Sequence, residues 1–178
     1  YAQANDIEDV KSKITDKTCA IMLECVLGEG GVLNITKEFA QDLNKLALEN
    51  DILIICDEVQ TGIGRSGRFL AQEVIGLKPD ITTLAKGLGG GLPIGAVLAN
   101  EKTKDVLSYG HHGSTFGANC VVCAGAYEVL NQMEKLLLGV DQKAKIIKDA
   151  LKGLKKVKSI SGMGLMIGVE IDTDINGL

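Results

Sequence analysis

Short apolar runs that alternate with amphipathic helical patterns constrain the fold of this chain more than any other feature. Two of these runs, residues 20–23 and 52–56, are too short for a helix and are typical of parallel strands covered on both faces. Between them, Thr36 can cap a helix whose apolar residues share one face: Phe39, Leu43, Leu46 and Ala47. Strand, helix and strand in this order predict an α/β sheet with helices on its faces.

The same alternation continues along the chain. Residues 81–84 and 94–99 are predicted to form two further strands. Apolar residues at helical spacing predict helices over 118–135 and 140–154, the second with lysines on its other side. The pattern therefore extends the sheet and adds two helices after it.

The last part of the chain has a different character. We expect glycine-rich turn structure at 159–164 and a final strand at 165–171. Residues 1–136 are interpreted as part of a large domain with a mostly parallel sheet flanked by helices. Residues 137–178 are interpreted as the incomplete start of a smaller C-terminal domain.

Charge and hydropathy exclude two classes of partner. The 178 residues carry a net charge of −4, with acids and lysines interspersed, so no basic stripe for nucleic acid is present. No apolar run reaches the roughly 18 residues of a membrane-spanning helix, so no membrane partner is expected. We expect a cytoplasmic protein. The chain begins at Tyr1 without an initiator Met, so we expect a longer intact protein that could carry a targeting segment.

Five cysteines are present: Cys19, Cys25, Cys56, Cys120 and Cys123. Their odd number and the apolar surroundings of three of them predict reduced, buried thiols. Cys120 and Cys123 form a C-x-x-C, but no second Cys or His pair stands at ligand spacing. We therefore interpret that pair as helix packing and expect no metal site.

Two candidate residues directly follow predicted strands. Asp57 ends the run at 52–56, where ligands of parallel sheets bind, and its carboxylate can meet a cationic group or simply cap a turn. Lys86 stands between the strand at 81–84 and a run of glycines. Partial desolvation there would lower its pKa and make the amine nucleophilic, whereas position alone favours a surface lysine.

Two further candidates are weaker. Ser114 and Thr115 lie in a glycine-flanked segment before the predicted helix at 118–135, where hydroxyls and free N–H groups suit a phosphate or form a plain N-cap. Glu24 and Glu29 flank a glycine-rich turn after the first strand. They could contact a cationic substrate or pair with a distant arginine.

Two motif matches point elsewhere. Residues 62–67 fit G-x-G-x-x-G by letter, but they do not follow a strand directly and lack the later acid of a dinucleotide site. Residues 52–58 resemble a Walker B strand that ends in Asp57 and Glu58. No Walker A sequence occurs in this chain, so a P-loop ATPase fragment stays open only as an alternative.

Taken in order, these segments resemble the class III, acetylornithine/ornithine-type aminotransferases that depend on pyridoxal 5'-phosphate (PLP). The matching stretches are residues 23–32, 56–62, 64–67, 79–81, 84–94 and 112–119. The resemblance covers essentially the whole chain as a central fragment. It implies the fold-type I architecture, PLP as cofactor and a homodimer.

The resemblance also implies a role for each residue around the cofactor. Lys86 forms the Schiff base and later moves the substrate proton. Asp57 keeps the pyridine nitrogen protonated, which makes the ring a better electron sink. Val59 packs on the ring, Gln60 bonds its phenolic oxygen, and Glu58 belongs to the same cofactor-binding segment.

Four other residues match the substrate and phosphate positions of the family. Thr115 reaches the cofactor phosphate from the other subunit, and Ser114 lies beside it at the substrate site. Glu29 matches an acid that gates the substrate site, usually with an arginine, and Glu24 belongs to the same substrate group. These positions imply binding of a small amino donor and a 2-oxo acid.

The chain departs from the family pattern after Glu24 and after Asn119. Cys25-Val26-Leu27 stands where the family usually has Pro-Val-Gln or Pro-Ile-Gln, and Cys120 stands where it has Pro. The upstream phosphate loop and the downstream substrate arginine of the family are absent from these 178 residues.

The implied reaction moves an amino group from acetylornithine, ornithine or a similar ω-amino donor to 2-oxoglutarate by a ping-pong Schiff-base mechanism. Because the phosphate loop is missing, we expect the isolated chain to bind PLP weakly and to be inactive. A non-catalytic fragment that serves dimerisation is the second alternative.

Overall fold

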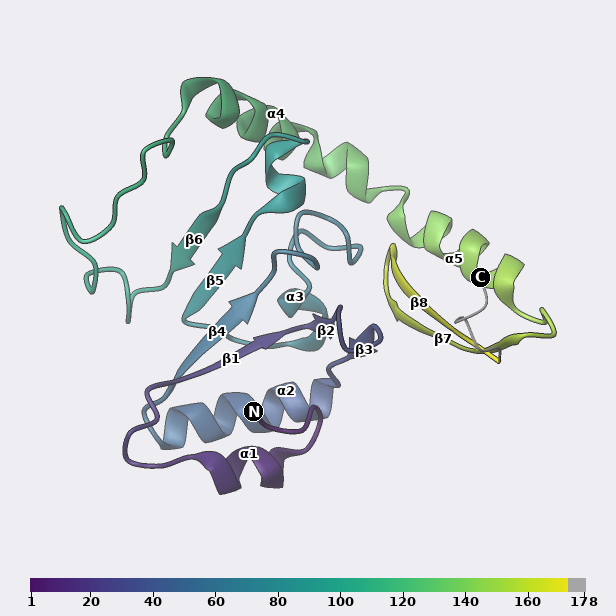
Figure 1. The fold of residues 1–178 in the computed structure, drawn as a ribbon, viewed down its shortest axis with the longest axis horizontal. Helices are drawn as coiled ribbons and strands as arrows, with labels where there is room; N and C mark the ends of the chain where they lie inside the picture. Colours follow the sequence, from purple (N-terminus) through teal and green to yellow (C-terminus); the bar gives the residue numbers. More distant parts are fainter. Residues whose placement is uncertain (173–178) are drawn as a thin grey trace.

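A four-stranded sheet forms the centre of the computed structural model, which describes residues 1–172 (Figure 1). Its strand order is β1-β4-β5-β6. The strands β1 (Ala20–Glu24), β4 (Leu53–Asp57) and β5 (Ile81–Leu84) run parallel, and β6 (Ala96–Ala99) pairs antiparallel with β5. The prediction of an α/β fold with a mostly parallel sheet is therefore confirmed.

The register of the parallel strands aligns three polar residues. Glu24 pairs with Asp57, and Asp57 pairs with Thr83 on the next strand. Because β1 and β4 end at the first two of these residues, their carboxylates stand at the carboxyl edge of the sheet, where ligands of such sheets bind.

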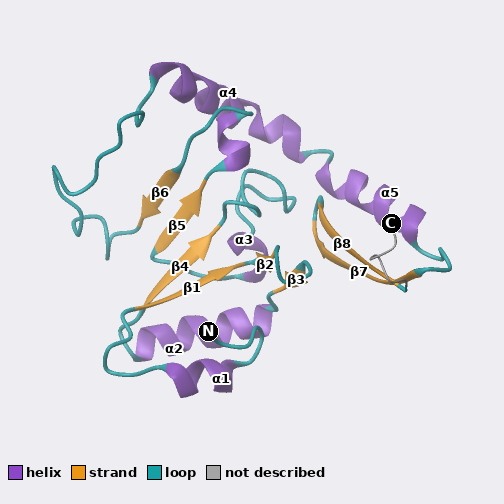
Figure 2. Cartoon of the chain, in the orientation of Figure 1, coloured by secondary structure: helices purple, strands orange, loops and turns teal. Residues whose placement is uncertain are grey.

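Helices pack below and beside this sheet, as Figure 2 shows for α1 (Ile7–Lys13), α2 (Lys37–Glu49) and the short α3 (Gln72–Ile75). The hydroxyl of Thr36 accepts the N–H of Phe39 at 3.1 Å, so Thr36 caps α2 as expected. The apolar face of α2 joins β1, β4 and α3 in the main core, which includes Phe39, Ala40, Leu43, Leu46, Ala47, Ile54 and Ile75.

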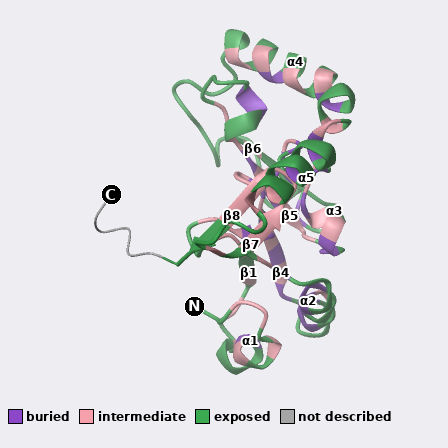
Figure 3. Ribbon diagram, turned by 90° about the vertical axis from the view of Figure 1, so that its right-hand side faces the viewer, coloured by how far each residue is buried: buried purple, intermediate pink, exposed green. Residues whose placement is uncertain are grey.

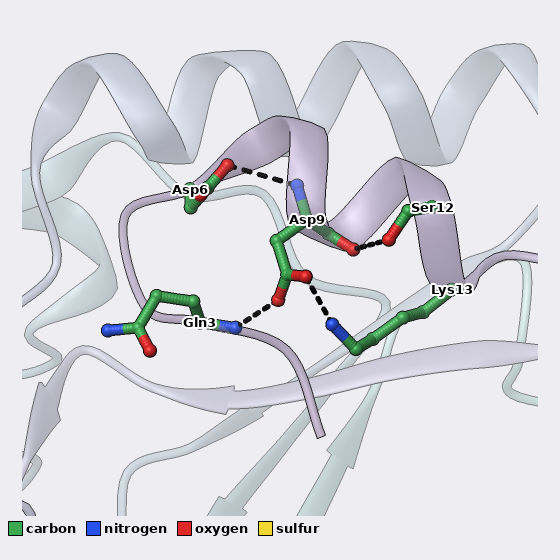
Figure 4. Close-up of polar contacts among 5 residues, drawn as sticks. All are labelled: Gln3, Asp6, Asp9, Ser12 and Lys13. Carbon is green, nitrogen blue, oxygen red and sulfur yellow. Dashed lines mark hydrogen bonds and ion pairs between the residues drawn. The ribbon is translucent and has the colours of Figure 1, made fainter.

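The start of α1 is fixed by a small polar network (Figure 4). Asp6 caps the helix by accepting the N–H of Asp9 at 3.0 Å. The Asp9 carboxylate accepts the backbone N–H of Gln3 at 2.6 Å and a hydrogen bond from the Lys13 ammonium. These two bonds, that of Lys13 first, hold the pKa of Asp9 below its ordinary value. The chain before α1 is thereby tied to the helix.

A second core lies between the sheet and α4 (Cys120–Leu137). It contains Leu84, Leu88 of the 3-10 helix η1 (Lys86–Gly89), and Ala126. Much of the remaining surface of α4 is exposed (Figure 3). Within residues 1–172, no helix is both long and apolar enough to cross a membrane.

The segment after α4 forms α5 (Val140–Leu151) and an antiparallel hairpin of β7 (Val157–Met163) and β8 (Met166–Ile171). The turn expected at 159–164 is wrong for most of its length, because pairing with β8 keeps residues 159–163 in a strand despite Gly162. The final strand is confirmed as β8. The division into domains 1–136 and 137–178 stays a prediction, and its residues 173–178 lie outside the described part.

A two-stranded hairpin of β2 (Val26–Leu27) and β3 (Leu33–Asn34) follows β1, and β3 contacts β7. Neither short strand was expected, because two residues carry no readable period. The Nδ2 of Asn34 donates to the carbonyl of Gly162 at 3.4 Å, which joins this hairpin to the C-terminal one.

The cysteines divide into two groups. Cys25 and Cys56 are buried, as expected, whereas Cys19, Cys120 and Cys123 are exposed. The interpretation of Cys120 and Cys123 as helix packing is therefore wrong for this chain. Both lie in the first turn of α4, on a surface that nothing within residues 1–172 covers.

Candidate functional site

A cavity of about 620 Å³ lies beside Lys86 at the carboxyl edge of the sheet. Four of the residues singled out from the sequence line it: Lys86, Val59, Gln60 and Glu29. Its other walls come from the loop at 62–65, the end of α4, the start of α5 and the tip of the β7–β8 hairpin. Segments far apart in the chain thus meet at the predicted catalytic lysine.

Backbone strain is concentrated around this cavity. Lys86, Ile63 and Val32 all line it, and all have positive φ angles of 44°, 53° and 58°. Left-handed conformations are unusual for any residue with a Cβ and are outliers for β-branched ones. Such strain costs on the order of 1–3 kcal/mol per residue and clusters at functional sites. The three angles therefore support a functional role for the cavity.

Lys86 follows β5 directly and begins the 3-10 helix η1. Its side chain is exposed. The expectation that this amine is partly desolvated is therefore wrong for the chain as described, because no element within residues 1–172 closes over it. This exposure agrees with the alternative that Lys86 is a surface lysine. However, Lys86 also lines a cavity, which a lysine on a flat surface would not do.

Asp57 is the last residue of β4 and is half-buried. Its Oδ1 accepts the backbone N–H of Val59 at 2.9 Å, which is the turn-capping contact that its position allowed. Asp57 does not line the cavity itself; it lies beside Glu24 on the neighbouring strand. The capping bond orients Val59 and Gln60, the next residues along the cavity wall.

Gln60 is held by the turn after β2. A Cβ at Gly28 would lie 2.6 Å from Nε2 of Gln60, so any larger residue there would make the Gln60 amide shift. Glu24 accepts the N–H of Gly28 at 3.5 Å, and Glu29 beside it is exposed at the cavity. Glu29 therefore lines the cavity together with Gln60, whereas Glu24, the last residue of β1, does not line it.

Glu58 has no exposed surface. Its Oε1 accepts the backbone N–H of Gln72 at 2.7 Å, and its Oε2 accepts the hydroxyl of buried Thr61. The prediction that Glu58 contacts the cofactor stays a prediction, while these bonds support a structural role that joins β4 to α3.

Ser114 and Thr115 are exposed and do not line the Lys86 cavity. The alternative that one of them forms the N-cap of the helix is wrong, because α4 begins at Cys120. Asn119 caps it by accepting the N–H groups of Val121 and Val122 at 3.0 and 3.2 Å. The backbone before Asn119 forms turns. The role of Ser114 and Thr115 in a partner subunit's site stays a prediction.

Two cationic residues of the cavity were missed from the sequence: Arg65 and Lys143. Arg65 lies inside the misleading G-x-G-x-x-G match, and its position among turn glycines was the only available signal. Lys143 belonged to the lysine-rich side of a predicted helix, which indicates solvent. Only the packing of α5 near the loop at 62–65 places it at the cavity.

Comparison with known proteins identifies relatives over nearly the whole chain. Residues 1–177 match the family Aminotransferase class-III. The acetylornithine aminotransferase of Haemophilus ducreyi is 53% identical over 175 residues, which cover 97% of this chain and 44% of that protein. The acetylornithine aminotransferase of Methanocaldococcus jannaschii is 45% identical over 178 residues, with 97% and 45% covered.

Solved structures agree in fold. The N-acetylornithine aminotransferase of Stenotrophomonas maltophilia superposes with a TM-score of 0.87 at 30% identity, covering 99% of this chain and 48% of that one. The ornithine delta-aminotransferase of Plasmodium falciparum gives 0.85 at 36% identity, covering 94% and 46%. The chain thus spans less than half the length of these relatives. Given the match over residues 1–177, the chain belongs to the class III aminotransferase family.

Proposed function

We propose that this chain is the central part of a PLP-dependent aminotransferase that takes an amino group from acetylornithine, ornithine or a similar ω-amino donor. The observation that carries the proposal is Lys86, strained at φ 44° beside a cavity that Val59 and Gln60 also line. Relatives named acetylornithine aminotransferase support the donor, and 2-oxoglutarate is the proposed acceptor. Membership of this family removes the ATPase alternative for Asp57 and Glu58.

The residues around the cavity fit PLP. The cofactor needs an amine for its aldehyde, a carboxylate for its ring nitrogen, an apolar contact for its ring and a donor for its phenolic oxygen. Lys86, Asp57, Val59 and Gln60 supply these four groups at one edge of the sheet. When bound, PLP withdraws electrons from the substrate carbon and so makes its proton acidic.

Each residue of the chain then has a defined task. With PLP bound, the Nζ of Lys86 would hold the cofactor through its aldehyde and would serve as the base that moves the proton at the substrate carbon. The Asp57 carboxylate holds a proton on the ring nitrogen by charge. The Gln60 amide would donate to the phenolic oxygen, and Glu29 and Glu24 would contact the substrate.

The same cavity serves donor and acceptor in turn, which is the basis of the proposed ping-pong order. We propose a homodimer in which Ser114 and Thr115 reach the partner's site, which agrees with their exposure and with a Lys86 cavity that they do not line. The isolated 178-residue chain is proposed to be inactive, since it lacks the phosphate loop expected upstream. The non-catalytic dimerisation fragment remains its alternative.

Replacement of Lys86 in the full-length protein tests the assignment. After PLP loading, borohydride reduction and desalting, the wild-type protein should retain cofactor covalently and Lys86→Ala should retain none. Transfer from acetylornithine to 2-oxoglutarate should fall by about a thousandfold or more. Lys17→Ala, remote from the cavity, is the matched control. Full activity of Lys86→Ala would overturn the proposal, and turnover by the 178-residue chain would overturn its proposed inactivity.

A further inference from the structure

Three groups that commonly bind metals meet in the interior behind the carboxyl edge of the sheet. Cys25, Cys56 and Glu58 have no exposed surface. The two sulfur atoms lie 3.5 Å apart, and the Cys25 sulfur lies 3.8 Å from Oε1 of Glu58. All three ligand atoms lie within 4.8 Å of one another. The Lys86 cavity uses none of these side chains.

These separations match the edges of a zinc coordination tetrahedron. Zinc binds thiolate sulfur at about 2.3 Å and carboxylate oxygen at about 2.0 Å. A tetrahedron with those bond lengths has edges of about 3.8 Å between two sulfurs and about 3.5 Å between sulfur and oxygen. The observed 3.5 and 3.8 Å differ from these edges by only a few tenths of an ångström. Small side-chain movements would therefore place these three atoms at three corners of the tetrahedron.

The charge of the cluster also favours a cation. The bonds that Glu58 accepts come from neutral donors: the N–H of Gln72, the hydroxyl of Thr61 and the thiol of Cys25. Among residues 1–172, no lysine, arginine or histidine forms an ion pair with it. A buried carboxylate without a cation is costly, and a bound metal ion would supply the missing charge.

We propose that Cys25, Cys56 and Glu58 form a structural site for a thiophilic divalent cation of the zinc class. The cation takes two thiolates and one carboxylate, and the two displaced thiol protons pass to solvent. Until then, the bond to Cys56 and burial keep the pKa of the Cys25 thiol above its ordinary range, so the sulfur stays protonated.

The site would fix both neighbours of Asp57. Cys56 precedes Asp57 at the end of β4 and Glu58 follows it, while Cys25 belongs to the segment after β1. A cation there would clamp the ends of two strands from behind the cavity.

Titration with cadmium, which absorbs in the ultraviolet when bound to thiolates, tests the proposal. Reduced, metal-free full-length protein should bind one Cd²⁺ with two-thiolate absorption, and Zn²⁺ should displace it. Cys25→Ser and Cys56→Ser should each weaken binding by about tenfold or more. The double variant Cys120→Ser/Cys123→Ser and the variant Lys86→Ala should bind as the wild type does. No thiolate band, or a band lost only in the Cys120/Cys123 variant, would overturn the site.

A measurement on the wild-type protein covers the case in which the cysteine variants fail to fold. The ¹¹³Cd chemical shift depends on the number of bound sulfurs. A single resonance in the range of two sulfurs with oxygen ligands is expected. A resonance typical of oxygen ligands alone, or of four sulfurs, would contradict the proposal.

Discussion

The backbone N–H of Leu165 donates a hydrogen bond to the carbonyl of Arg65 across 2.8 Å. This bond joins the tip of the β7–β8 hairpin to the loop that lines the Lys86 cavity. Gly164 makes the approach possible, because a Cβ there would lie 2.5 Å from the same carbonyl oxygen. The C-terminal hairpin therefore shapes the wall of the cavity.

Replacement of Gly164 by alanine should detach this hairpin. The new Cβ would clash with Arg65 and would also occupy a residue with φ of 54°, at a combined cost of about 1–3 kcal/mol. Hydrogen exchange of the Leu165 amide should accelerate. Gly153→Ala is the matched control, since its φ is 83° but nothing lies within 4 Å of its Cβ. Equal exchange in both variants would show that the clash is unimportant.

Glu58→Gln should destabilise the chain even with a chelator present. The amide nitrogen of glutamine cannot accept, so either the Gln72 N–H or the Thr61 hydroxyl loses its buried acceptor. We expect a loss of about 1–3 kcal/mol in the free energy of unfolding, measured by urea titration. Exposed Glu134→Gln should change it by less than about 0.5 kcal/mol. A neutral result for Glu58→Gln would disprove the structural role.

Asp57→Asn should separate charge from geometry at the proposed cofactor site. Asparagine keeps an oxygen for the Val59 N–H but cannot hold a proton on the ring nitrogen by charge. In the full-length enzyme, kcat should fall by about tenfold or more, with an unchanged unfolding temperature. Asp105→Asn, at an exposed residue, should leave both unchanged. An active Asp57→Asn variant would refute the assigned role.

The Asp9 network predicts a stability loss in acid. Lys13 and Gln3 lower the pKa of Asp9 in the folded chain. The ionised Asp9 carboxylate therefore contributes fully to the free energy of unfolding when the pH is above the ordinary pKa near 3.8. This contribution disappears as pH falls below that value and through the lowered pKa. NMR titration of the Asp9 carboxylate should show the lowered pKa, and Lys13→Met should raise it. Lys17→Met, outside this network, should leave it unchanged.

The sheet was predictable from the sequence because its strands are short apolar runs with sharp boundaries. The runs at 20–23, 52–56 and 81–84 became β1, β4 and β5, within one residue at each end. Strand β7 was not predictable, because Gly162 within it and Gly164 just beyond it indicate turns, and only pairing with β8 holds it extended. Helix α1 was also not predicted. It has only seven residues and a single buried one, Val10, so its sequence shows no helical repeat of apolar residues.

The candidate site divides in the same way. Lys86 and Asp57 could be singled out because each follows a strand, and strand ends meet at one edge. The walls made by Arg65, Lys143 and Leu165 depend on how α5 and the hairpin pack, which no local pattern encodes. Cys25 and Cys56 stand 31 residues apart, so their contact follows from the parallel pairing of β1 with β4 and not from a motif.

At residue 86, the left-handed backbone favours glycine for stability, whereas the proposed chemistry requires the amine of lysine. Glycine adopts this conformation without the cost of about 1–2 kcal/mol that a side chain incurs. A library of variants sorted only for thermal tolerance would therefore drift toward glycine at residue 86 and discard the amine. Retention of lysine at this residue under selection for activity would show that activity requires the amine, because folding alone gives no reason to keep it.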